Sequence, residues 1–263
     1  MLKGIDHIVI LVRDLAAAIE DYRRLGFTVT PGGEHVGLGT HNALITFEDG
    51  AYFELIAFKE PDRPHDQRWW PRLAAGEGPV DYCVFGDDLE GEAAAMRARG
   101  VAGLHGPFAM GRQRPDGVRI DWRLVSLTAP IGQSVVPFMI EDTTPRELRV
   151  PGGAAARHPL GVTGVAGLVL VADNLERAAG ELAQAIGIEG QPAAPSVEGA
   201  AGARHFTLGR HRLEVVQPAP GANPLAEHLA RFGANPYEIQ LHGPEPKLLP
   251  TDTAHGARIR VVV

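Results

Sequence analysis

Apolar and polar residues along this chain follow two periods, one typical of strands and one typical of helices. Three segments share a layout in which a short apolar run precedes Asp-Leu or Asn-Leu, and a glycine follows the Asp or Asn twelve or thirteen positions later. The segments begin at Asp14, Asp88 and Asn174 and end at Gly26, Gly100 and Gly187. Asp and Asn are good helix N-caps, and glycine suits the turn after a helix. The layout therefore predicts a repeated strand–helix unit.

The residues between each cap and its glycine support the helices. Apolar residues recur there at helical spacing, on faces formed by Leu15, Ala18, Ile19, Tyr22 and Leu25, by Leu89, Ala93 and Met96, and by Leu175, Ala179, Leu182 and Ile186. The strands expected before the helices are Ile5–Val12, Val80–Phe85 and Gly167–Val171.

Further strands are expected after each helix. In the first unit they are Phe27–Thr30, Asn42–Phe47 and Ala51–Phe58, with a Gly-rich loop at Pro31–Gly39 and a turn at Glu48-Asp49-Gly50. The second unit ends with Arg119–Leu127 and Ser134–Ile140, and the third with Ala203–Leu208 and Arg212–Val216. A truncated fourth unit has a helix from Asn223-Pro224 to about Phe232 and strands near Tyr237–Leu241 and Ala257–Val263.

This order predicts an α+β fold built from tandem βαβββ modules. One helix covers only one face of a four-stranded sheet, so we expect the modules to pair into cupped, mostly antiparallel sheets with helices outside. Residues 141–159 are rich in Pro and Gly and are interpreted as a linker. The expected domains are 1–145, with two modules and the candidate cavity, and 158–263, with one full and one truncated module.

Composition narrows the function classes. Hydrophobic residues make up 44% and charged residues 22% of the 263 positions, as in ordinary globular proteins. A formal net charge of −7 argues against a nucleic-acid surface, which needs clustered Lys and Arg. The longest uncharged apolar run, Ile8–Val12, is far shorter than the ~20 residues of a membrane span. We therefore expect a small-molecule ligand rather than nucleic acid or membrane, and sheet-edge pairing would allow a homodimer.

Cysteine usage and the N-terminal sequence indicate a cytoplasmic protein. Cys83 is the only cysteine, which excludes an internal disulfide framework and a cysteine-based metal site. Met1-Leu2-Lys3 does not lead into a signal-peptide pattern, because Asp6 and His7 interrupt it.

His7 and Glu54 are the residues with the clearest chemical potential. His7 lies in an apolar run and Glu54 in a second one, so each needs a hydrogen-bond partner or a ligand. On neighbouring strands of one sheet, the pair would be able to hold a metal ion. The alternative is a core histidine bonded to a backbone carbonyl or to Glu54 itself.

Several short motifs resemble the glyoxalase-like domain proteins of the vicinal oxygen chelate superfamily, which includes glyoxalase I, extradiol dioxygenases and bleomycin-resistance proteins. They are Gly39-Thr40-His41-Asn42, Pro115-Asp116-Gly117, Trp122-Arg123-Leu124, Pro137-Phe138-Met139-Ile140 and His158-Pro159-Leu160-Gly161. The resemblance covers roughly residues 4–217 and implies metal ligands on the first and fourth strands of two paired modules.

Applied to this sequence, the resemblance implies His7 and Glu54 as ligands from the first module. In the second module Asp81 stands at the position of the second His, and the fourth-strand position falls near Phe138, which is no ligand. Asp81 has the alternative of an edge residue that faces water. In the third module Glu214 matches Glu54, but Gly167 replaces the His, so we expect no metal there. One imidazole with two carboxylates would suit Zn, Mn, Ni, Mg or Fe.

The expected substrate-binding residues surround this site. They come from the Gly-rich loop and from the second module, and they are His35, Thr40, His41, Asn42, Arg114, Trp122, Arg123 and Phe138. His35 or His41 would polarise a substrate or replace a missing ligand, with solvated loop residues as the alternative. Arg112, Arg114, Arg119 and Arg123 form either a cationic wall or a solvated sheet face, and Trp69-Trp70 either a lid or an edge cover.

Three functions remain open on this basis. The first is a metal-dependent enzyme of the lyase/isomerase or dioxygenase type that acts on a small oxygen-rich substrate. The second is a metal-free protein that sequesters a small molecule, as bleomycin-resistance proteins do. The third is a scaffold or regulator with a vestigial pocket.

Overall fold

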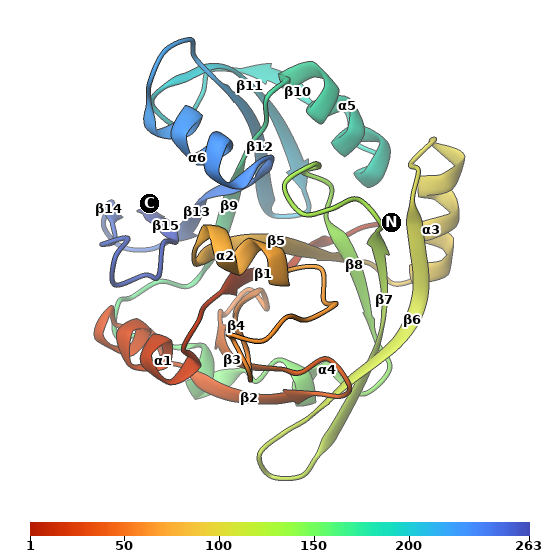
Figure 1. Cartoon of the computed structure of the whole chain (residues 1–263), viewed down its shortest axis with the longest axis vertical. Helices are drawn as coiled ribbons and strands as arrows, with labels where there is room; N and C mark the ends of the chain where they lie inside the picture. Colours follow the sequence, from red (N-terminus) through yellow and green to blue (C-terminus); the bar gives the residue numbers. More distant parts are fainter.

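Two β-sheets form the chain's framework, one closed into a barrel and one open, with the helices on the outside (Figure 1). The computed structural model describes residues 1–263. The barrel strands in sheet order are β1 (Gly4–Leu11), β4 (Tyr52–Phe58), β3 (Thr40–Thr46), β2 (Thr30–His35), β6 (Leu104–Gln113), β7 (Arg119–Leu127), β8 (Phe138–Asp142) and β5 (Gly78–Phe85).

The open sheet is built from the rest of the chain. Its strands in order are β10 (Gln191–Ala193), β11 (Ala200–Leu208), β12 (His211–Pro218), β9 (Gly164–Val171), β13 (Asn235–His242), β15 (Arg258–Val262) and β14 (Lys247–Leu248). The helices are α1 (Leu15–Arg24), α2 (Trp70–Ala75), α3 (Leu89–Ala98), α4 (Arg146–Arg149), α5 (Leu175–Ile186) and α6 (Pro224–Phe232), with a 3-10 turn η1 (Gly153–Ala156). None of the helices has the length and apolar character needed to cross a bilayer.

The repeated strand–helix unit and the α+β class are confirmed. Asp14, Asp88 and Asn174 are the N-caps of α1, α3 and α5, and each side chain accepts a hydrogen bond from the backbone N–H three residues later. Helix α5 ends at Gly187, whose φ of 71° lies in the left-handed region. Local capping chemistry was therefore a sound guide to these helices.

Three barrel strands differ from the sequence prediction, the predicted strand Phe27–Thr30 is not formed, and β10 and β14 of the open sheet were not predicted. Residues predicted as a Gly-rich loop form β2, which ends at His35, and β6 was not predicted at all. Strand β8 begins at Phe138 instead of Ser134. Pro and Gly in β2 and β6 lower β-propensity, but pairing with β3, β7 and each other supplies their backbone partners.

The segment interpreted as a linker is packed against the barrel. It contains α4 and η1, and Arg149 on α4 is only 2% exposed. His158 accepts a hydrogen bond from Thr28 N at 3.0 Å, and its Nε2 lies 3.0 Å from Thr46 O. The segment connects the barrel to the open sheet, and these contacts hold it against the first module.

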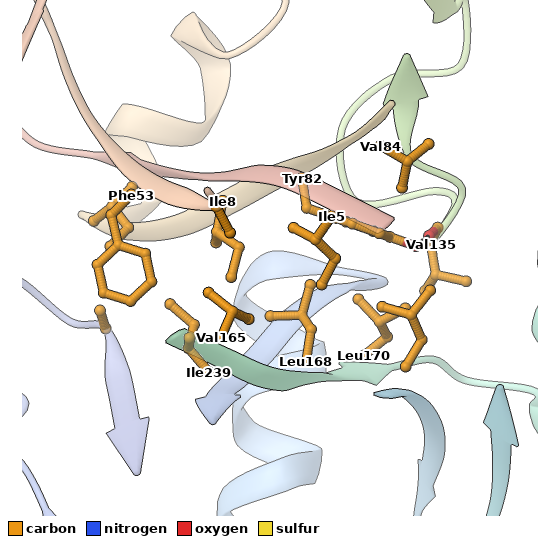
Figure 2. Close-up of a cluster of buried hydrophobic side chains, with 14 of the residues drawn as sticks. Ile5, Ile8, Phe53, Tyr82, Val84, Val135, Val165, Leu168, Leu170 and Ile239 are labelled. Carbon is orange, nitrogen blue, oxygen red and sulfur yellow. Dashed lines mark hydrogen bonds between the residues drawn. The ribbon is translucent and has the colours of Figure 1, made fainter. Parts of the chain in front are cut away.

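One continuous hydrophobic core joins the barrel to the open sheet. Figure 2 shows the contact: Ile5, Ile8 and Phe53 on the outer face of the barrel lie opposite Leu168 and Ile239 of the open sheet. Strands β1 and β4 are consequently buried on both faces, which explains their continuous apolar sequence. The inner face of the same two strands is left to form the site.

Two polar contacts reinforce the junction between the halves. Ile5 N donates a hydrogen bond to His211 Nδ1 at 2.9 Å. The turn before His211 contains Gly209, whose φ is 61° and whose backbone lies against Lys3. A Cβ added at Gly209 would lie 1.9 Å from the carbonyl oxygen of Lys3. The β11–β12 turn thus needs a glycine for both its conformation and its close approach.

His255 ties the last loop of the chain to the first module. Its Nε2 lies 3.0 Å from Asp21 Oδ2 and its Nδ1 lies 3.1 Å from Glu77 Oε2. Both partners are acceptors, so an imidazole that donates to both carries two protons. The hydrogen bond from His255 lowers the pKa of Glu77 below its ordinary value of 4.5 and outweighs the opposing effect of burial.

We expect Gly209→Ala to destabilise the protein by about 2 kcal/mol or more, because the added methyl group meets backbone as well as an unfavourable φ. The matched control is Gly50→Ala, which has a φ of 85° but no atom within 4 Å of the added Cβ. Urea unfolding measures both. Equal losses for the two variants would mean that only backbone strain matters at Gly209.

We expect His255→Gln to lower the free energy of unfolding by about 1 kcal/mol at about pH 6. The pKa of Glu77 is lowered in the fold, so its contribution is present above its ordinary pKa and is lost as pH falls through the lowered one. The difference between the variant and the original protein should therefore shrink as pH falls below the ordinary pKa of Glu77. The control, His242→Gln, changes an exposed histidine and should have no effect; a difference that grows in acid would contradict the expectation.

Candidate functional site

The inner face of the barrel brings His7 and Glu54 together. Strands β1 and β4 are parallel neighbours with Val9 opposite Glu54. Side chains alternate along a strand, so His7 and Val9 on β1 face the same side as Glu54 and Ile56 on β4. His7 Nε2 lies 3.6 Å from Glu54 Oε2, and both residues are buried.

A β-bulge sets the partner of His7. On β1, Ile5 pairs with Val84 and His7 pairs with Cys83, so Asp6 is the extra residue. The bulge places the Asp6 carboxylate 2.7 Å from His7 Nδ1. Arg149 donates to both oxygens of Asp6 at 2.9 Å, and Arg146 donates to one of them at 2.5 Å.

These contacts determine the tautomer of neutral His7. Burial alone would raise the pKa of Asp6, but the charge of Arg149 and the hydrogen bonds from His7 and Arg149 hold it well below its usual range. Asp6 is therefore a carboxylate that only accepts, and His7 Nδ1 carries the proton that it receives. In neutral His7 the lone pair of Nε2 then faces Glu54.

Glu54 lies at the centre of a second set of contacts. Asn42 Nδ2 donates to Glu54 Oε1 at 2.6 Å, and His35 Nε2 lies 3.4 Å from the same oxygen. Arg112 Nη1 donates to Asn42 Oδ1 at 3.2 Å, which orients the amide toward Glu54. Burial opposes ionisation, but His35, His7 and Asn42 together hold the pKa of Glu54 at about 2. Glu54 is thus an anion between two imidazoles.

These groups open onto a cavity of about 310 Å³ inside the barrel. Its walls are mostly apolar, and Trp69, Trp122 and Phe138 provide the large aromatic surfaces. Arg112 also lines the cavity, although it is only 3% exposed. Its Nε has no hydrogen-bond partner, and no carboxylate lies within 4.0 Å of its guanidinium. The cavity therefore combines an apolar body with a polar end formed by His7, Glu54, His35 and Asn42.

The structure places some of the site residues predicted from the sequence together at the cavity. Among those residues, the ones that line the cavity are His7, Glu54, His35, Asn42, Trp122 and Phe138. Thr40 is buried next to His35, with its Oγ1 2.9 Å from His35 Nδ1. Of the tryptophans predicted as a lid or an edge cover, Trp69 lines the cavity and Trp70 packs on Phe58.

Besides Thr40, four of the named residues lie outside the cavity lining. His41 alternates with Asn42 on β3 and is not among the lining residues. Arg123 pairs with Glu90 and Glu141, and Arg114 pairs with Asp116, on the outside of the barrel. Asp81 accepts a hydrogen bond from Trp69 Nε1 at 3.1 Å and lies 3.4 Å from Arg68, away from Glu54. Asp81 is buried, so the alternative of an aspartate that faces water is wrong.

Sequence reasoning missed Asp6, Arg149 and the position of Arg112. Asp6 precedes His7 directly, but only the bulge turns the two side chains toward each other. Arg112 shares a face with Met110 on β6, a strand that was not predicted. Arg149 lies in the presumed linker, and a single buried arginine there leaves no periodic signal.

Two groups of side chains have the residue types of a metal site. Asp6, His7 and Cys83 offer ligand atoms within 4.8 Å of one another. However, burial raises the pKa of the Cys83 thiol well above its usual range, and two arginines already neutralise Asp6. His7, His35 and Glu54 are more suitable donor types for a divalent ion and they face the cavity, with the two imidazoles next to different oxygens of Glu54.

Comparison with known proteins decides the family. The family described as "Glyoxalase-like domain" matches residues 5–186, which is most of the chain. The chain belongs to this family. A search of curated proteins finds no match.

Solved structures support the fold of this glyoxalase-like chain. A hypothetical protein from Staphylococcus aureus is 13% identical, with a TM-score of 0.72 over 100% of this chain and 99% of that one. A mutant of 4-hydroxymandelate synthase from Streptomyces coelicolor is 12% identical, with a TM-score of 0.61 over 93% of this chain and 72% of that one. At such identities the likeness concerns the fold, which is the vicinal oxygen chelate fold.

In this glyoxalase-like chain we expect Arg149→Met to lower the free energy of unfolding by about 3–5 kcal/mol, because it leaves buried Asp6 without its main counter-charge. Adding Asp6→Asn should recover part of that loss, since the pair interacts directly. The control, Arg114→Met, removes a partly exposed pair and should cost less than about 1 kcal/mol. Strictly additive losses in the double variant would contradict this account of the ion pair.

Proposed function

We propose that this chain is a divalent-metal-dependent enzyme that acts on a small oxygen-rich molecule inside the barrel. The observation that carries the proposal is the orientation of His7, whose Nδ1 donates to Asp6 while its Nε2 faces the Glu54 carboxylate at 3.6 Å. When His7 is neutral, its Nε2 lone pair and the Glu54 carboxylate repel each other in this buried site. A cation between them removes that repulsion.

Distances support His7 and Glu54 as ligands, with His35 as a third candidate. Two ligand atoms bound to one ion at about 2.1 Å lie about 3.0–3.5 Å apart. Glu54 Oε2 lies 3.6 Å from His7 Nε2, close to that range, and Glu54 Oε1 lies 3.4 Å from His35 Nε2. The two imidazoles thus face different oxygens of Glu54, and an ion held by all three residues would draw them together. In that case His35 would take the place that the family resemblance assigned to Asp81.

Residues around the ligands would serve the substrate. Asp6 keeps His7 in the tautomer that exposes Nε2, as carboxylates behind metal-bound histidines do. Asn42 keeps Glu54 in place, and Arg112 in turn orients Asn42. The bound ion would act as a Lewis acid toward two neighbouring substrate oxygens. Trp122 and Phe138 would cover the apolar part and exclude water.

The identity of the ion separates the two reaction classes. Zinc and magnesium have no redox chemistry, so they restrict the enzyme to lyase or isomerase reactions. Two imidazoles and one carboxylate also suit iron, which supports dioxygenase chemistry.

A second function, metal-free sequestration of a small molecule, is favoured by one observation. The second module supplies no ligand to the cavity, because Asp81 is bonded to Trp69 and Phe138 is apolar. In that case a protonated imidazole would balance Glu54, and the cavity would only bind.

We expect protein purified without chelator or metal-affinity resin to contain about one equivalent of a divalent metal per chain. His7→Gln and Glu54→Gln should each reduce that content about tenfold or more, because each removes a ligand. Elemental analysis by mass spectrometry measures it, and circular dichroism checks the fold.

His41→Gln is the matched control, since His41 is on β3 beside Asn42 but does not line the cavity. It should keep the full metal content. A folded original protein that takes up no metal even when Zn, Mn, Ni or Fe is added would overturn the metal proposal and favour sequestration.

A further inference from the structure

A second recess adjoins the mouth of the barrel cavity. It has a volume of about 610 Å³ and lies between α2, α6 and the loop 128–131. Arg68, Phe108 and Ser126 line both this recess and the barrel cavity, so the two spaces are neighbours. Figure 1 shows α2 from the first half next to α6 from the second half, and the recess lies at their junction.

The lining of this recess is cationic. Arg68, Arg72, His105 and Arg231 all contribute to it, and no Asp or Glu does. Of these groups, only Arg68 has a carboxylate partner, Asp81 at 3.4 Å. A recess with several basic side chains and no acid attracts anions.

Arg72 is the decisive residue, because it is buried and its charge is not neutralised. It is only 5% exposed, and its guanidinium lies 3.5 Å from the centre of the Phe232 ring. It donates to the carbonyl oxygens of Gly76 and Glu77, but its Nε has no partner and no carboxylate lies within 4.0 Å. Burial, with a contribution from Arg231, lowers its pKa to about 10, so it stays charged at neutral pH.

Arg231 adds a second unneutralised charge beside it. Its guanidinium lies 4.8 Å from the same Phe232 ring, and its Nε donates to Ala75 O at 2.7 Å. The guanidinium groups of Arg72 and Arg231 repel each other across the Phe232 ring. A contact that only held α2 against α6 would not need both arginines.

From this arrangement we propose that the recess binds the carboxylate or phosphate group of a ligand whose apolar part extends into the barrel. Arginine is suited to both groups, since its planar guanidinium donates two parallel hydrogen bonds to them. Phe108, which is 43% exposed on the shared rim, would contact the apolar part between the two ends. This inference rests on the proposed function in one respect, namely that the barrel cavity holds part of the ligand. It does not require a bound metal ion.

The test uses chelator-treated full-length protein and three probes with the same chain: octyl phosphate, octanoate and octanol. Titration calorimetry should show that at least one of the two anions binds about tenfold tighter than octanol. Whichever anion binds more tightly identifies the head group. Because no metal is present, failure of the metal proposal does not affect this result.

Arg231→Gln should weaken binding of the better anion about tenfold and leave octanol binding unchanged. Arg231 is exposed, so this variant should fold. Arg210→Gln is the control for net charge, since Arg210 is exposed in the β11–β12 turn, away from the recess. Anions that bind no better than octanol, or equal effects of the two substitutions, would overturn the proposal.

Discussion

The buried ion pair between Asp6 and Arg149 is the interaction on which the site depends. Arg149 follows the last strand of the barrel, and Asp6 is in the first strand, so the pair closes the barrel across 143 positions of sequence. Isolated buried charges are costly, and this pair is sustained by additional hydrogen bonds to Tyr52, Asp142 and Arg146. Its consequence for function is that Asp6 remains an acceptor and keeps His7 Nε2 directed at Glu54.

Burial of β1 and β4 on both faces gives this site a rigid support. Outward residues such as Ile8 and Phe53 pack on the open sheet, and inward residues such as His7 and Glu54 form the polar end of the cavity. A shift of either strand would disturb both faces at once, because the side-chain period of a strand is two. The open sheet thus contributes to the site without supplying a ligand to it.

The repeated module of the second half differs from that of the first half. Glu214 on β12 corresponds to Glu54, but Ser196 N and Oγ both donate to its carboxylate. The face of the open sheet away from the barrel is covered by α6 and filled by apolar residues such as Val171 and Leu225. The first half therefore holds the cavity, and the junction with the second half supplies the cationic recess beside it.

Sequence alone determined the strand–helix repeat, the caps at Asp14, Asp88 and Asn174, and the placing of His7 and Glu54 in apolar strands, but not which face of those strands they occupy. These features follow from local rules, namely capping, period and alternation. The tertiary structure alone decided which further residues meet them. His35 reaches Glu54 through a Gly-rich strand that only its neighbours stabilise, and Arg112 reaches the cavity from the unpredicted β6. Asp6 turns toward His7 because of a bulge, and Arg149 meets it from a segment without periodicity. Such contacts depend on strand register and on residues distant in sequence, so no local sequence pattern predicts them.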